Sequence, residues 1–112
     1  MGCKINKLRK VIVTSALPYA NGDIHIGHLL EHIQTDIWVR SLKACNHEVL
    51  SFCADDAHGA PIMMMAEELN VEPNDFIIDI KAKHIASLDK FGITYTNYHS
   101  THTDENKNLS EE

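Results

Sequence analysis

No hydrophobic run in this 112-residue sequence is long enough to span a membrane. Cysteine is scarce as well: the sequence has three, none in a C-x-x-C pair, which argues against a disulfide framework and favours reduced thiols. The patterns G-x-x-x-x-G-K-[ST] and G-x-G-x-x-G are both absent, which excludes a P-loop and a dinucleotide fingerprint. The remaining composition, 44% apolar and 23% charged, is that of a soluble globular chain, for which we expect a cytoplasmic location.

Basic residues are scarce beyond the first ten positions. Four of the ten lysines and arginines precede residue 11, which leaves six basic against sixteen acidic residues in the rest of the chain. Such an acidic surface repels phosphate backbones and does not by itself form a nucleic-acid interface. We therefore expect a basic arm at residues 1–10 and a separate domain at residues 11–112.

The hydrophobic pattern predicts a strand, a helix and a second strand. The run Val11–Thr14 is short and β-branched, as expected of a strand buried on both faces of a parallel sheet. Apolar residues at helical spacing predict a helix over about residues 25–43, with Asp23 as its N-cap. Residues 47–53 form the second strand, parallel to the first, so the loops after both strands should open on one edge of an α/β sheet.

Three more helices are predicted downstream. The first runs from about Pro61 to residue 70, and its consecutive methionines are interpreted as core filling. The second begins near residue 72 and ends near Gly92, and a short extended piece follows at residues 93–95. The third is capped by Thr103. The predicted buried face of the second helix consists of Phe76, Ile77, Ile80, His84, Leu88 and Phe91, with His84 in a structural role.

The connection between the first strand and the first helix is suited to binding a small ligand, because ligands bind at the carboxyl ends of strands in open α/β sheets. His25 and His28 lie three residues apart in the first helical turn, where free backbone N–H groups attract an anion. Two imidazoles there can donate hydrogen bonds to a phosphate. Gly27 leaves the backbone open to a flat ring, and Gly22 allows the loop to turn.

Two other patterns compete with this interpretation. His28, Glu31 and His32 form H-x-x-E-H, the pattern of inverted zincins, in which the histidines would hold zinc and the glutamate would act as general base. No third ligand stands out, so a zinc peptidase is the weaker reading. The cluster of Asp55, Asp56 and His58 within residues 54–59 has three interpretations: it supplies a carboxylate for a substrate ammonium group, it binds a divalent metal, or it is a solvated loop. We favour the ammonium-binding carboxylate, because this loop opens on the same edge as the histidines.

Several segments together resemble the class I aminoacyl-tRNA synthetases and, within them, the methionyl-tRNA synthetase family. Residues 25–28 read HIGH, the family's signature. Further similar segments are residues 14–22, 31–34, 53–59 and 97–102. The resemblance runs from about residue 11 to the end of the sequence. It implies a Rossmann-like parallel sheet that forms the N-terminal half of a catalytic domain, truncated at its C-terminal end.

The resemblance also implies a reaction, in which methionine and ATP, supplied with Mg²⁺, give methionyl-adenylate and pyrophosphate before the methionyl group passes to tRNA. The catalytic residues that it implies are His25 and His28, which would stabilise the α-phosphate in the transition state. The implied ATP-binding residues are Pro18, Asn21, Gly22, His25, Gly27 and His28, with Gly27 against the adenine. The implied methionine-binding residues are Ala16, Leu17, Tyr19 and Asp56, with Asp56 holding the α-ammonium group.

Three parts of the family do not occur in this sequence: the lysine-rich KMSKS loop, the cysteine-ligated zinc knob and the helical anticodon-binding domain. We therefore expect a fragment that is inactive alone. Zinc, and most contacts to the initiator and elongator methionine tRNAs, are expected to belong to the missing regions. A stand-alone synthetase-like binding module is the alternative.

Overall fold

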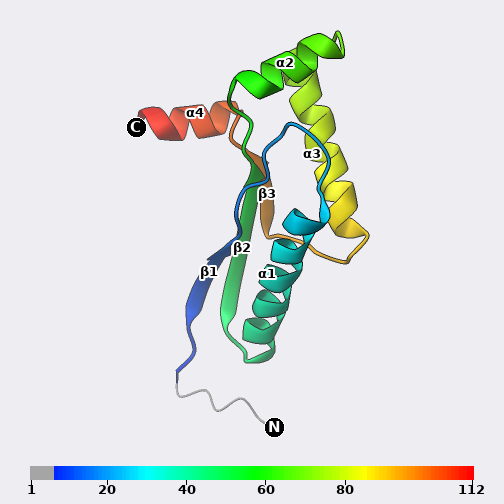
Figure 1. Cartoon of the computed structure of the whole chain (residues 1–112). Helices are drawn as coiled ribbons and strands as arrows, with labels where there is room; N and C mark the ends of the chain where they lie inside the picture. The colour runs from blue at the N-terminus through cyan, green and yellow to red at the C-terminus, as the bar shows by residue number, and fades with distance from the viewer. Residues whose placement is uncertain (1–6) are drawn as a thin grey trace.

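The computed structural model describes residues 7–112 and contains one three-stranded parallel sheet (Figure 1). Its strands are β1 (Lys10–Thr14), β2 (Glu48–Asp55) and β3 (Asn97–Ser100), in the order β1-β2-β3. Four helices complete the fold: α1 (Ile26–Ala44), α2 (Ala60–Glu68), α3 (Pro73–Asp89) and α4 (Asp104–Glu111). The predicted α/β class and the parallel pairing of the first two strands are confirmed. None of the helices between residues 7 and 112 is both long and apolar enough to cross a membrane.

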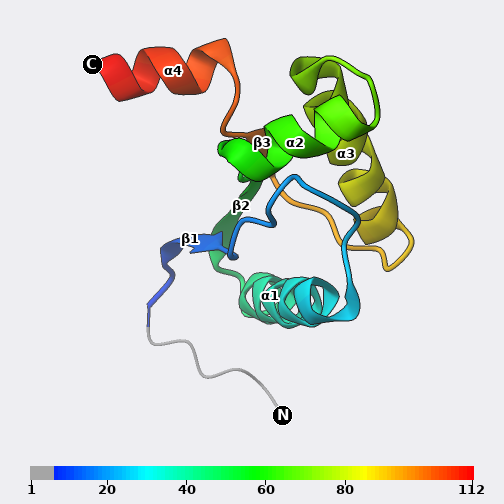
Figure 2. The ribbon, with the colours of Figure 1, turned by 45° about the horizontal axis from the view of Figure 1, so that its top comes forward.

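The hydrophobic core lies at the carboxyl ends of the strands, between α2, α3 and the loop that follows β1 (Figure 2). Its buried members are Ala20, Ala57, Ile62, Ala66, Phe76, Ile77 and Ile80. One of them, Ala20, belongs to the loop that leads into α1, and its neighbour Tyr19 packs against the same cluster. The loop that carries the predicted site is therefore anchored in the core.

Strand β1 differs from its prediction, because it is not buried on both faces. Ile12 is 69% exposed, and Leu50, its partner across the β1–β2 register, is 41% exposed. Since register partners share a face, one face of these two strands is open. Helix α1 contacts both strands. Val11 and Val13 are only half-buried, because β1 is also the edge of the sheet.

Other expectations were wrong in detail. The extended piece predicted at residues 93–95 is displaced, since β3 starts at Asn97. Phe91 is exposed because helix α3 ends at Asp89, which removes Phe91 from its buried face. Among the methionines of α2, only Met65 packs against the core, because consecutive helical residues point in different directions.

Two further expectations concerned the cysteines and the N-terminal basic segment. Cys53 is a free, buried thiol, as expected, but Cys45 is in a disulfide, so the prediction of reduced thiols fails there. Of the predicted basic arm, residues 1–6 lie outside the described residues. Lys10 belongs to β1 and lies 3.4 Å from the carboxylate of Glu48.

Candidate functional site

The imidazole of His25 caps helix α1. Its Nδ1 accepts hydrogen bonds from the backbone N–H groups of Gly27, at 3.1 Å, and His28, at 3.4 Å. The predicted cap, Asp23, is wrong, because α1 begins at Ile26 and the N-cap is the residue directly before it. Since Nδ1 is an acceptor here, a neutral His25 ring carries its proton on Nε2.

Gly27 makes room for this cap. A Cβ atom at Gly27 would lie 3.0 Å from Cε1 of His25, so the missing side chain lets the His25 ring lie against the start of the helix. This ring also occupies two backbone N–H groups that we expected to be free for an anion. At the N-terminus of α1 the imidazoles, rather than those two amides, are therefore the groups left to contact a phosphate.

The ring of His28 stacks on the ring of His25, and the surroundings of His28 favour its own neutral form. The two ring centroids are 3.7 Å apart and the ring planes differ by 19°. Burial, and then the charges of His25 and His84, lower the pKa of His28 below its usual value, although Glu31 opposes them. The Nδ1 atom of His28 is buried without a hydrogen-bond partner. The neutral ring has one N–H group, which makes it a hydrogen-bond donor without a full charge.

Backbone hydrogen bonds join the loop after β1 to the end of β2. The N–H of Asp56 donates to the carbonyl of Pro18, and the N–H of Ala20 donates to the carbonyl of Asp56, both at 2.9 Å. The N–H of Ala16 donates to Oε1 of Glu31 at 2.6 Å, which ties the start of the loop to α1. The prediction that both loops open on one edge of the sheet is confirmed.

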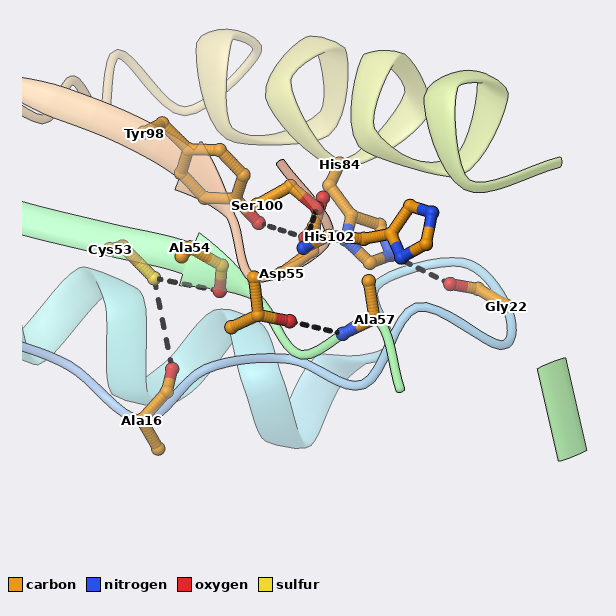
Figure 3. A network of polar contacts seen from close by, with 11 residues as sticks. Ala16, Gly22, Cys53, Ala54, Asp55, Ala57, His84, Tyr98, Ser100 and His102 are labelled. Carbon is orange, nitrogen blue, oxygen red and sulfur yellow. Dashed lines mark hydrogen bonds and ion pairs between the residues drawn. The ribbon is translucent and has the colours of Figure 1, made fainter. Parts of the chain in front are cut away.

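The adjacent aspartates at the end of β2 lie in opposite environments. Asp55 is the last residue of the strand, not part of a loop as predicted, and is completely buried. Its Oδ1 accepts hydrogen bonds from Nδ1 of His84, at 2.6 Å, and from the hydroxyl of Tyr98, at 2.5 Å (Figure 3). Asp56 is exposed, so it is the member of the pair whose carboxylate is open to a ligand.

Sequence reasoning missed the part that His84 and Tyr98 play beside the site. Burial, reinforced by the hydrogen bond and charge of Asp55, raises the pKa of Tyr98 far above its usual range. Asp55 continues the alternating burial of β2, but the sequence does not show this alternation, because the buried face carries Ser51 and the other face carries Leu50. His84 was placed on the buried face of its helix, but no sequence pattern points to its partner.

The H-x-x-E-H residues have other partners. His32 is buried, and its Nδ1 is hydrogen-bonded to the hydroxyl of Tyr95 at 2.6 Å. Burial raises the pKa of Tyr95 to about 12. Glu31 binds the backbone of Ala16. Within residues 7–112, no group of three or more histidine, cysteine or acidic side chains is arranged to hold a metal ion.

The remaining predicted residues lie along the same loop. Ala16, Leu17 and Asn21 are exposed, whereas Pro18 is buried. Leu17 borders a cavity of about 260 Å³ at the carboxyl ends of the strands. The cavity is also lined by Thr14, Phe52, Cys53, Ala54, Asn97, His99, Ser100, Thr101 and Asn106.

Gly22 and Gly59 differ in whether their backbone conformation and surroundings require a glycine. The chain bends at Gly22, but this residue has no positive φ and a Cβ there would meet nothing within 4 Å, so the bend does not require glycine. Gly59, at the start of α2, has a φ of +123°, and a Cβ there would lie 2.7 Å from the hydroxyl of Tyr19. The lack of a side chain at Gly59 therefore allows Tyr19 to lie close to the chain after β2.

Most of this chain is similar to known proteins. Residues 11–112 match the family model described as tRNA synthetases class I (M). Proteins named methionine–tRNA ligase from Psychrobacter cryohalolentis and Psychrobacter arcticus are each 59% identical over 105 residues, which is 94% of this chain. The chain spans only 15% of the length of these curated relatives.

Two solved structures share the fold. Mycobacterium tuberculosis methionyl-tRNA synthetase in complex with methionyl-adenylate has a TM-score of 0.89 and 21% identity, and the match covers 93% of this chain and 20% of that one. A ternary complex of Agrobacterium radiobacter K84 LeuRS with tRNA and LeuAMS has a TM-score of 0.79 and 25% identity, covering 90% and 13%.

Proposed function

Because this chain belongs to the class I tRNA synthetases (M), we propose that it forms part of the catalytic domain of a methionine–tRNA ligase. That enzyme joins methionine to ATP as methionyl-adenylate, releases pyrophosphate and passes the methionyl group to tRNA. The observation that carries the proposal is the stacked pair of His25 and His28 at the N-terminus of α1. The loop leading to this pair is joined by hydrogen bonds to the end of β2.

The two histidines act on the phosphate by positioning and electrostatics, not as nucleophiles. His25 uses Nδ1 to cap the helix, which leaves the N–H at Nε2 to donate to the α-phosphate. His28 supplies a second donor beside it. Negative charge grows on the phosphate oxygens as the transition state forms, so these donors lower its free energy more than that of bound substrate.

The methionine side of the proposed site begins at the exposed carboxylate of Asp56, which binds the α-ammonium group. Its backbone bonds to Pro18 and Ala20 support this role, because they hold Asp56 beside the loop. Ala16 and Leu17 from that loop, with Tyr19, line the side-chain end. Leu17 borders the cavity at the end of the sheet, which supports its part in this lining.

The nucleotide side consists of Pro18, Asn21 and Gly22 together with the helix start at His25, Gly27 and His28. Gly27 adds no side chain between the adenine and the backbone. Mg²⁺ enters with ATP as part of the substrate. The net negative charge of residues 11–112 supports binding of the initiator and elongator methionine tRNAs mainly by other regions, and we propose a cytoplasmic enzyme.

The test is a complete Psychrobacter relative in which this segment replaces the matching one. His28→Ala should lower kcat for methionine-dependent ATP–pyrophosphate exchange by about 100-fold, with little change in KM for methionine. His47→Ala is the matched control, because His47 lies before β2 at the opposite edge of the sheet, where its Nδ1 accepts from the N–H of Arg9. Unchanged exchange in the His28→Ala enzyme would refute the proposed role.

A further inference from the structure

His84 is the most deeply buried histidine beside the site, and both of its ring nitrogens are bound. Only 1% of the residue is exposed. Nδ1 lies 2.6 Å from Oδ1 of Asp55, and Nε2 lies 2.7 Å from the carbonyl oxygen of Gly22. One side chain of α3 therefore joins the end of β2 to the loop that leads into α1 (Figure 3).

The two acceptors determine the protonation of this ring. Oδ1 of Asp55 already accepts a hydrogen bond from the Tyr98 hydroxyl, and the backbone carbonyl of Gly22 can only accept hydrogen bonds. Both contacts of His84 are therefore N–H donations, and a histidine ring donates from both nitrogens only as the imidazolium. The other carboxylate oxygen of Asp55, Oδ2, is buried without a partner, so the interactions of this carboxylate converge on Oδ1.

The surrounding charges favour the imidazolium. Burial alone would lower the pKa of His84, but its hydrogen bonds to Asp55 and Gly22, and the charges of Asp55 and Asp23, outweigh burial and raise the pKa. Two groups on α1 oppose this, because His28 and His32 interact repulsively with a charged His84. Tyr98 from β3 shares the Asp55 oxygen as a neutral donor.

The hydrogen bond from His84 to Gly22 restrains the second half of the loop between β1 and α1, which the other hydrogen bonds of the loop do not reach. The ties at Ala16, Pro18 and Ala20 hold its first half. Gly22 is three residues before His25, whose ring must reach the start of α1 to cap it. We propose that His84 is a positioning residue for His25 and His28, acting through Gly22 as a ring protonated on both nitrogens.

This inference rests on the proposed function only for its catalytic consequence. When the ring loses one proton, the remaining N–H stays with the carboxylate of Asp55, the stronger acceptor. The lone pair of Nε2 then faces the carbonyl oxygen of Gly22, and the loop is released. The loop is therefore held below the pKa of His84 and freed above it.

The direct test uses nuclear magnetic resonance of the 112-residue chain labelled with ¹⁵N. At neutral pH both ring nitrogens of His84, identified by their loss in His84→Gln, should have the shifts of protonated nitrogen. The amides of Gly27 and His28, which donate to the His25 ring, should lose their protection from hydrogen exchange as pH rises, with the midpoint of the His84 titration. A His84 ring with one bare nitrogen at neutral pH would contradict the proposal.

Two variants separate positioning from general stability. His84→Asn keeps an amide donor for Asp55 but is too short to reach Gly22, and it should raise the exchange rates of the Gly27 and His28 amides by at least tenfold, while the β1–β2 amides stay protected. Tyr98→Phe is the matched control, because it removes the other donor to Oδ1 of Asp55 and leaves the Gly22 contact in place. Equal loop exchange in the two variants would overturn the proposal.

The Psychrobacter chimera tests the catalytic consequence. His84→Asn should reduce kcat for adenylate formation by about tenfold without a matching rise in KM for methionine, and Tyr98→Phe should change neither by more than about twofold. If His28→Ala loses activity and His84→Asn does not, the positioning role fails and the proposed function stands. If His28→Ala keeps its activity, the proposed function fails, and loop exchange alone decides the role of His84.

Discussion

The rings of His25 and His28 stack with their centroids 3.7 Å apart, and the first of them caps the helix that carries the second. The proposed function gives this imidazole a second task besides capping. Its Nδ1 accepts from backbone donors at the helix start, which leaves Nε2 to carry the proton of the neutral ring. Substitutions at these positions can separate the structural task from the chemical one.

Replacing His25 should distinguish capping from catalysis. His25→Ala removes the cap and should lower the free energy of unfolding by about 1 kcal/mol, whereas asparagine caps helices well and His25→Asn should preserve stability. Both variants remove the outward N–H and should lower exchange activity in the chimera. Chemical unfolding of the 112-residue chain and pyrophosphate exchange provide the two measurements. Full activity in His25→Asn would show that the cap alone matters.

Gly27→Ala should stabilise the chain less when the His25 ring is present than when it is absent. Alanine normally favours a helix over glycine by about 1 kcal/mol, but the added Cβ would crowd Cε1 of His25. We expect Gly27→Ala to gain less than this in the native chain and to recover the gain in a His25→Ala background. A double-mutant cycle of unfolding free energies measures the coupling. Additive effects would mean that the ring does not need the space at Gly27.

The chain should lose stability in acid through His28 and His32. The pKa of each is lowered in the folded state, mainly by burial, so the unfolded chain binds more protons as pH falls below about 6.5. The folded state loses stability over that range. His28→Gln should flatten the acid side of a plot of unfolding free energy against pH. An unchanged slope would contradict the burial of His28 as a neutral ring.

His84 should affect the pH dependence of stability in the opposite direction to His28 and His32. Its folded pKa is raised, so its contribution is fully present below the unfolded pKa and is lost as pH rises through the folded value. His84→Gln should remove stability at neutral pH and flatten the alkaline side of the same plot. A loss independent of pH would argue that His84 is neutral in the native chain.

Two glycines in the loops should respond differently to alanine. Gly59→Ala forces a positive φ on alanine and places its Cβ 2.7 Å from the Tyr19 hydroxyl, so it should cost about 1–3 kcal/mol of unfolding free energy. Gly22→Ala meets no neighbour and no positive φ, and should change stability by less than about 0.5 kcal/mol. Thermal unfolding of both variants checks this contrast. Comparable losses would show that the loop at Gly22 requires glycine for another reason.

The sequence alone determined the local features and the edge of the sheet at which they meet. Short apolar, β-branched runs predicted the first two strands, and apolar residues at a spacing of about 3.6 predicted the first helix, because such patterns follow from the local geometry of each element. The cap at Thr103 was predicted correctly, since its side chain accepts from Asn106 only three residues away. Parallel pairing of β1 and β2 placed the two loops together, as the backbone bonds between Pro18, Ala20 and Asp56 confirm.

Only the tertiary structure decided how the site is supported. The contact of His84 with Asp55 joins residues 29 apart, and its contact with Gly22 joins residues 62 apart, so no local period records either of them. The exposure of Ile12 likewise depends on which face of the sheet is covered, not on the β-branched character of its strand. Burial, hydrogen bonding and charge at His84 are set by four segments packed together, and their balance exists only once the chain has folded.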